Sequence, residues 1–253
     1  MIDIKILNKI IDFGDKYREK YLFKNTDKNK VENDWWDALL FFFDRAYYQG
    51  RRDAVSKKVH DAALKVFQEL SPNKNVDLKN FKQDNWQIFE NKLKKVIGKG
   101  KIGKYADIRM TIETFQFIEK LDDLQRNISR YSIEKISNGN IKELYFELQK
   151  EIFSVGPKIS SFYLRDLISI FYLDDKISEQ DLQFIQPIDT WVRQVCYRIG
   201  LTNDLHENEM AIRNKIVKIC NKNNLSSLKF NQGAWFLGSN SFDILLRNIE
   251  KIE

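Results

Sequence analysis

Apolar residues recur along the chain at spacings of three and four, which is the period of an amphipathic helix. The pattern is clear at residues 4–13, 34–46, 85–97, 105–121 and 158–173. Polar clusters separate these segments, and the chain holds only 10 Gly and 3 Pro in 253 residues. A β-sandwich or barrel needs more turn residues than this, so we predict an all-α fold.

Two glycine-containing segments are predicted to interrupt the helices near the ends of the chain. Gly14 follows the first apolar stripe and is expected to bend or end that helix. The aromatic segment at residues 230–236, which contains Gly233, is expected to lie between helices at residues 208–221 and 240–252.

Composition narrows the class further. Hydrophobic residues make up 43% and charged residues 31% of the chain, which supports a folded core. The two cysteines, Cys196 and Cys220, lack metal-binding spacing, so we expect no metal and no cofactor. The longest apolar run, residues 38–43, is too short to cross a bilayer, and the start has no signal-peptide core. These features predict a cytoplasmic, nucleoid-associated protein without a membrane contact. The net charge of +6 is compatible with a polyanionic partner, and nucleic acid is the first candidate.

Candidate chemistry gathers at a short hairpin between two predicted helices within residues 141–173. The hairpin includes Val155 and Gly156, and it leaves backbone N–H groups free to hold a phosphate. Pro157 suits the first helical position, where a missing N–H costs little. Lys158 then falls in the first turn, where the positive end of the helix dipole favours a neutral, nucleophilic amine. An ordinary loop-to-helix junction with a solvated lysine is the alternative interpretation.

Asp189 lies 31 residues after Lys158 and is a good N-cap for another predicted helix, at residues 190–199. A helix start keeps a carboxylate ionised, because the dipole and the free N–H groups favour negative charge. A carboxylate that faces an amine across a pocket could hold the amine or a water in place and stabilise a cationic sugar. A plain N-cap is the alternative interpretation of Asp189.

Together these segments resemble the signature of the helix-hairpin-helix DNA glycosylases. Residues 152–158 (IFSVGPK) end in the lysine that marks the bifunctional members, and residues 187–193 (PIDTWVR) contain the later aspartate. Residues 46–56 resemble the early helix-turn-helix of the family, and residues 103–108 resemble the helix start after its intercalating loop. The similarity runs through about residues 34–199 in the family's order.

The resemblance implies a bifunctional DNA glycosylase and AP lyase of base excision repair, a hydrolase and lyase acting on damaged double-stranded DNA. Lys158 would attack the anomeric carbon and form a Schiff base, and Asp189 would stabilise positive charge on the sugar. β-Elimination would then cut the strand. Contacts to DNA are expected from Gln49, Arg51, Arg52, Lys101, Ile102, Lys104, Val155 and Gly156. Candidates for stacking on the extruded base are Phe162, Trp235 and Trp35.

The chain also departs from the family pattern. Ser154 stands where the hairpin usually has its first glycine, and Pro157 removes one N–H, which predicts a weaker grip on phosphate. The interval between Lys158 and Asp189 is similar to that of the archaeal 8-oxoguanine glycosylases. The four-cysteine cluster of the endonuclease III branch is missing. We therefore predict an oxidised purine, above all 8-oxoguanine, as the substrate.

The family fold implies a monomer with two helical lobes. We expect a six-helix-barrel-like domain at residues 34–153 and a second lobe formed by residues 1–33 plus 174–253. The helix-hairpin-helix, residues 141–173, would lie at the cleft between the lobes. The alternatives are a non-catalytic helix-hairpin-helix DNA-binding protein and a glycosylase of other base specificity. A helical interaction scaffold would explain the apolar stripes but not Lys158 together with Asp189.

Overall fold

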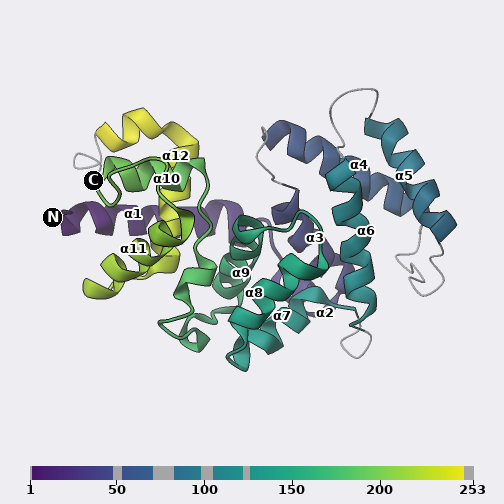
Figure 1. The fold of residues 1–253 in the computed structure, drawn as a ribbon, viewed down its shortest axis with the longest axis horizontal. Helices are drawn as coiled ribbons and strands as arrows, with labels where there is room; N and C mark the ends of the chain where they lie inside the picture. Colours follow the sequence, from purple (N-terminus) through teal and green to yellow (C-terminus); the bar gives the residue numbers. More distant parts are fainter. Residues whose placement is uncertain (1, 48–52, 71–82, 98–104, 122–125, 248–253) are drawn as a thin grey trace. The chain divides into compact units, whose positions relative to one another are not determined.

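The computed structural model describes residues 2–47, 53–70, 83–97, 105–121 and 126–247. Every regular element in these residues is a helix, and none of them forms a strand (Figure 1). The predicted all-α class is therefore confirmed for the described part of the chain. Packing divides the chain into two compact units. Unit 1 comprises residues 1–27, 136–142 and 160–253, and unit 2 comprises residues 28–135 and 143–159.

Unit 1 contains the first and the last helices of the chain. Its elements are α1 (Ile4–Tyr17), the π-helical turn η1 (Arg18–Phe23), most of α9 (Pro157–Phe171), the 3-10 turns η4 (Asp174–Lys176) and η5 (Leu182–Ile185), α10 (Thr190–Arg198), α11 (Glu209–Lys222) and α12 (Ser227–Arg247).

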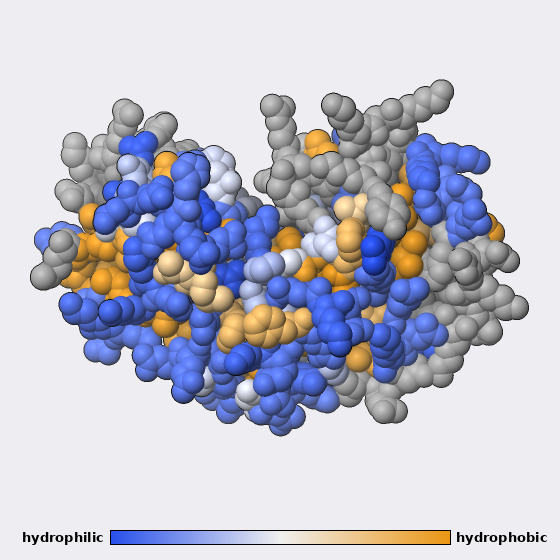
Figure 2. Space-filling view, viewed as in Figure 1, coloured by the Kyte–Doolittle hydropathy of each residue, from blue (hydrophilic) through white to orange (hydrophobic). Residues whose placement is uncertain are grey.

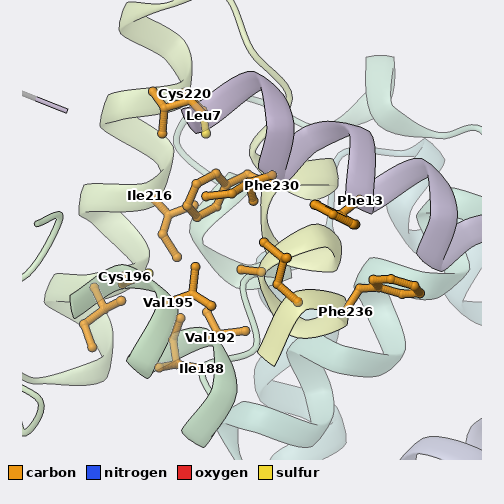
Figure 3. Packing of buried hydrophobic residues seen from close by; sticks show 14 of the residues in the cluster. Leu7, Phe13, Ile188, Val192, Val195, Cys196, Ile216, Cys220, Phe230 and Phe236 are labelled. Atoms are coloured by element: carbon orange, nitrogen blue, oxygen red, sulfur yellow. The ribbon is translucent and has the colours of Figure 1, made fainter. Parts of the chain in front are cut away.

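The core of unit 1 lies between α1, α10, α11 and α12, whose apolar side chains point toward one another (Figure 3). Leu7 of α1, Val195 of α10, Ile216 of α11 and Phe230 of α12 are all completely buried. Their burial removes apolar surface from water, at roughly 25 cal/mol for each Å². The helical spacing seen in the sequence is thus the spacing of one shared core.

Gly14 and Gly233 are packing residues, which corrects two predictions made from the sequence. α1 continues through Gly14, and α12 includes the whole aromatic segment at residues 230–236. A Cβ atom on Gly233 would lie 1.7 Å from the carbonyl oxygen of Ile10, and one on Gly14 would lie 2.3 Å from that of Lys229. The backbones of α1 and α12 approach so closely that only glycine fits at their crossing.

Unit 2 is formed by helices from the middle of the chain. They are α2 (Lys28–Asn33), α3 (Trp35–Ala46), α4 (Asp53–Leu70), α5 (Gln83–Ile97), α6 (Tyr105–Glu119), most of α7 (Ile128–Ser137) and most of α8 (Ile141–Glu151).

The centre of unit 2 is aromatic. Phe43 of α3 is completely buried, and its ring centroid lies 5.2 Å from that of Tyr47 and 6.2 Å from that of Phe115. The Tyr47 hydroxyl shares a 2.5 Å hydrogen bond with the hydroxyl of Thr111, so the one polar end of this ring is satisfied in the core. Large rings therefore join α3 to α6.

Hydrophilic residues cover much of the face shown in Figure 2, with hydrophobic patches between them. In the described part of the chain, no helix combines the length and the apolar composition that a membrane span requires.

Candidate functional site

A tight turn joins α8 to α9. α8 ends at Glu151 and α9 begins at Pro157, so five residues connect the two helices. The Val155 N–H donates to the Ile152 carbonyl oxygen at 3.1 Å, which closes the turn. The structure confirms the predicted helix start, with Pro157 in the first position and Lys158 in the first turn.

The residues of this turn leave its backbone open on one side. Ser154 has a φ of 66°, in the left-handed region that costs a non-glycine residue about 1 kcal/mol. A Cβ atom built on Gly156 would meet no atom within 4 Å, so space remains in front of its backbone. Val155 as a whole is buried, and its N–H is already bonded to Ile152, so the open space in this turn is at Gly156.

α6 holds the turn in place. The Phe153 N–H donates to a carboxylate oxygen of Glu113 at 2.6 Å, and Arg109 Nε donates to the other oxygen at 2.6 Å. The Arg109 guanidinium also lies 4.2 Å from the centroid of the Phe153 ring. Two side chains that are one helical turn apart on α6 thus fix both the backbone and the ring of Phe153.

Asp189 caps α10, as predicted. Its backbone is extended, with φ −104° and ψ −175°, and its side chain accepts a 2.9 Å hydrogen bond from the Val192 N–H. The residue is half-buried. Lys158 is also half-buried. Lys158 belongs to unit 2 and Asp189 to unit 1, so their meeting in one pocket stays a prediction.

A buried ionic network lies beside the segment that leads to Asp189. Arg165 of α9 is 1% exposed, and its guanidinium donates to Asp166, Asn231 and the Tyr17 hydroxyl at 2.8–2.9 Å. The Tyr17 hydroxyl donates to the second oxygen of Asp166 at 2.8 Å. Burial alone would lower the pKa of Arg165, but the charge of Asp166 and smaller contributions from Tyr17 and Asp189 leave that pKa raised.

The structure brings two of the three base-stacking candidates to this network. The Arg165 guanidinium lies 4.9 Å from the ring centroid of Phe162 and 4.9 Å from that of Tyr17. The Trp235 ring meets the Tyr17 ring edge-on, with their centroids 5.5 Å apart. Within unit 1, Phe162 therefore lies next to the buried Arg165, and Trp235 lies next to Tyr17 of the same network.

The third candidate, Trp35, lies in unit 2, where it packs edge-on against Trp36 with ring centroids 5.6 Å apart. Six of the predicted DNA contacts lie outside the described residues. They are Gln49, Arg51, Arg52, Lys101, Ile102 and Lys104.

The sequence analysis missed the network formed by Tyr17, Arg165, Asp166 and Asn231. One signal was present, because Arg165 and Asp166 are the only charged residues between Ile159 and Leu173. Charged residues are almost never fully buried unless they are paired, so such a doublet indicates a buried ion pair. Nothing in the sequence indicated that Tyr17 and Asn231, 148 and 66 residues away, complete it.

Both cysteines are buried free thiols in the core of unit 1. Burial raises the pKa of Cys220 to about 12, and it also raises the pKa of Cys196. Such thiols are inert packing residues rather than nucleophiles. Within the described ranges, no three His, Cys, Asp or Glu side chains form a group that could hold a metal ion.

Comparison with known proteins gives no match: no family model, no curated protein and no solved structure is similar to this chain.

Proposed function

We propose that this protein is a bifunctional DNA glycosylase and AP lyase that removes an oxidised purine, above all 8-oxoguanine, from double-stranded DNA. One observation carries the proposal: Lys158 lies in the first turn of a helix that follows a tight hairpin, and this hairpin has open space at Gly156. The position of Asp189 supports it, because this carboxylate caps the start of α10 and accepts a hydrogen bond from the Val192 N–H.

The proposed reaction begins with extrusion of the damaged nucleotide, which costs a few kcal/mol of stacking and pairing. The backbone at Gly156 and the start of α9 would hold a DNA phosphate, since a helix start presents N–H groups and a positive dipole end. The weaker grip expected from Pro157, which lacks an N–H, would be offset by contacts elsewhere along the duplex.

The chemical step uses Lys158 as the nucleophile. The amine in its unprotonated form would form a bond to the anomeric carbon while the bond between that carbon and the base breaks, and the base would leave with the proton that the amine nitrogen gives up. Asp189 would stabilise positive charge on the sugar as that bond breaks. Ring opening would give a Schiff base between lysine and sugar. Removal of a proton from the neighbouring sugar carbon would then expel the 3′ phosphate.

Borohydride trapping tests the lysine. The wild-type protein is incubated with a duplex that contains 8-oxoguanine, or an abasic site, and borohydride is added to reduce a Schiff base to a stable adduct. We expect an adduct with the wild-type protein and none with Lys158→Gln. Lys150→Gln is the matched control, because Lys150 is an exposed lysine in the last turn of α8. Trapping that survives Lys158→Gln would refute the assignment.

Asp189→Asn tests the carboxylate without removing the cap, because asparagine is as good an N-cap as aspartate. We expect base release to slow by about 100-fold, while binding to an uncleavable abasic duplex stays within about twofold. A duplex that binds tightly but loses no base would instead favour the non-catalytic DNA-binding alternative. A panel of other lesions in the same duplex would identify a glycosylase of different specificity.

A further inference from the structure

We propose that Asn231, oriented by Arg165, is a positioning residue for Asp189: it fixes the peptide that leads into the cap of α10. The proposal rests on the function proposed above, and it adds a residue that acts on the reaction through Asp189.

Asn231 joins two groups that have opposite hydrogen-bonding needs. Its side-chain oxygen accepts from Arg165 Nη1 at 2.8 Å, and its side-chain nitrogen donates to the carbonyl oxygen of Pro187 at 3.0 Å. The guanidinium can only donate and the carbonyl oxygen can only accept, so the amide has one possible orientation. Asn231 is completely buried, and water cannot replace either partner.

A second residue of α12 holds the same segment. Gln186 Nε2 donates to the Ser227 hydroxyl at 3.2 Å and to the Leu182 carbonyl oxygen at 3.1 Å. Gln186 and Pro187 are both buried, and the proline ring restricts its own φ. Two successive residues just before Asp189, Gln186 and Pro187, are thus each held by a side chain from the first two turns of α12.

The network also reaches the helix that carries Lys158. Arg165 follows Lys158 by seven residues on α9, or two helical turns, so both side chains leave the same side of that helix. Arg165 is itself held by Asp166 and Tyr17. One chain of hydrogen bonds therefore runs from α9 through Asn231 to the peptide before Asp189. Misplacement of a reacting group by about 1 Å can lower a rate by about 100-fold, so a small shift of this peptide would be felt in the reaction.

Two substitutions of Asn231 separate positioning from packing. Asn231→Asp keeps the acceptor for Arg165 but loses the donor to Pro187, whereas Asn231→Ala loses both. Gln232→Met is the matched control, because Gln232 is the next residue, is equally buried, and its side chain makes no hydrogen bond within the described structure. Ser227→Ala is a milder variant that weakens the hold on Gln186 and leaves Arg165 untouched.

Three quantities are measured for each variant: the single-turnover rate of base release from an 8-oxoguanine duplex, the Kd for an uncleavable abasic duplex, and amide hydrogen exchange of residues 186–193. For Asn231→Asp we expect a rate about 10-fold lower, an unchanged Kd and faster exchange at 186–193. Ser227→Ala should change the rate and the exchange in the same direction but less, and Gln232→Met should match the wild type.

An Asn231→Asp rate equal to that of the wild type would overturn the proposal. The proposal would also be overturned if Asn231→Ala lowered the rate of base release and Asn231→Asp did not. The role of Asn231 would then be to accept the hydrogen bond from Arg165. If Asn231→Asp does not fold, Ser227→Ala decides instead: an unchanged rate of base release and unchanged hydrogen exchange in that variant would overturn the proposal. A wild-type protein that releases no base would refute the proposed function instead, and the hold on residues 186–193 would then be decided by the exchange measurement alone.

Discussion

The segments that lead into Asp189 and into Lys158 are held by contrasting anchors. In unit 1, the peptide before Asp189 is fixed through Asn231 by Arg165 and Asp166, whose side chains are 1% and 0% exposed. In unit 2, the turn before Lys158 is fixed by Arg109 and Glu113, whose side chains are 45% and 21% exposed. The same kind of ion pair is thus sealed in a core in one unit and open to water in the other.

This difference in burial predicts a difference in energy and in mobility. A charge that is buried without its partner costs several kcal/mol, so the network around Arg165 has one stable arrangement. An exposed ion pair contributes about 0–1 kcal/mol, because water and salt screen it. We infer that the cap at Asp189 is rigid, while the turn before Lys158 is held weakly enough to adjust to a ligand.

The largest effect is expected from Asp166→Leu. The substitution leaves the buried Arg165 guanidinium without its countercharge, and we expect the free energy of unfolding to fall by about 3–5 kcal/mol. Urea denaturation followed by helical circular dichroism measures this loss. Glu113→Gln, the matched change in the exposed anchor, should cost less than about 1 kcal/mol.

Adding Arg165→Met to Asp166→Leu should recover much of the lost stability, because a buried ion pair can often be replaced by apolar residues of similar volume. Equal losses from Asp166→Leu and Glu113→Gln would show that burial does not distinguish the two anchors.

The contrast between the units explains which features the sequence could predict. Helical periodicity and the cap chemistry of Asp189 are local, so the all-α class and the starts of α9 and α10 were predicted correctly. The positions of Gly14 and Gly233 were found, but their roles were not. Glycine breaks an isolated helix, whereas here the α1–α12 crossing stabilises both helices through tertiary contacts.

The buried network is a different kind of omission. Arg165 and Asp166 are adjacent in the sequence, and their apolar surroundings indicate burial. Their partners Tyr17 and Asn231 come from opposite ends of the chain, and only the packing of α1 and α12 against α9 brings them together. No local pattern encodes a contact of that sequence separation.

Gly233→Ala should give the next largest effect. Its new Cβ would fall within the α1 backbone, 1.7 Å from the Ile10 carbonyl oxygen, so the two helices must separate. We expect a loss of about 1–3 kcal/mol in the free energy of unfolding, together with faster hydrogen exchange in α1 and α12.

Gly156→Ala is the control for Gly233→Ala, because the space in front of Gly156 is open. It should leave stability within about 0.5 kcal/mol and weaken binding to abasic duplex DNA. Loss of stability in Gly156→Ala would contradict the open side of the turn.

The smallest effect is expected at the exposed end of α8, and it should depend on pH. Glu151, the residue before the turn, accepts a 2.5 Å hydrogen bond from the Lys120 ammonium group. That hydrogen bond and the positive charge of Lys120 lower the pKa of Glu151 in the folded protein. A lowered carboxyl pKa stabilises the fold at pH values above the ordinary pKa of 4.5, and this contribution disappears as the pH falls through the folded-state pKa.

Lys120→Met should therefore lower the free energy of unfolding by less than about 1 kcal/mol at pH 7, and the difference from the wild type should vanish in strongly acidic solution. Urea denaturation of both proteins at several pH values measures it, with Lys142→Met, an exposed lysine at the start of α8, as a control for the loss of one positive charge. A loss of several kcal/mol, or a loss independent of pH, would mean that the ion pair of Lys120 and Glu151 behaves like the buried network of unit 1.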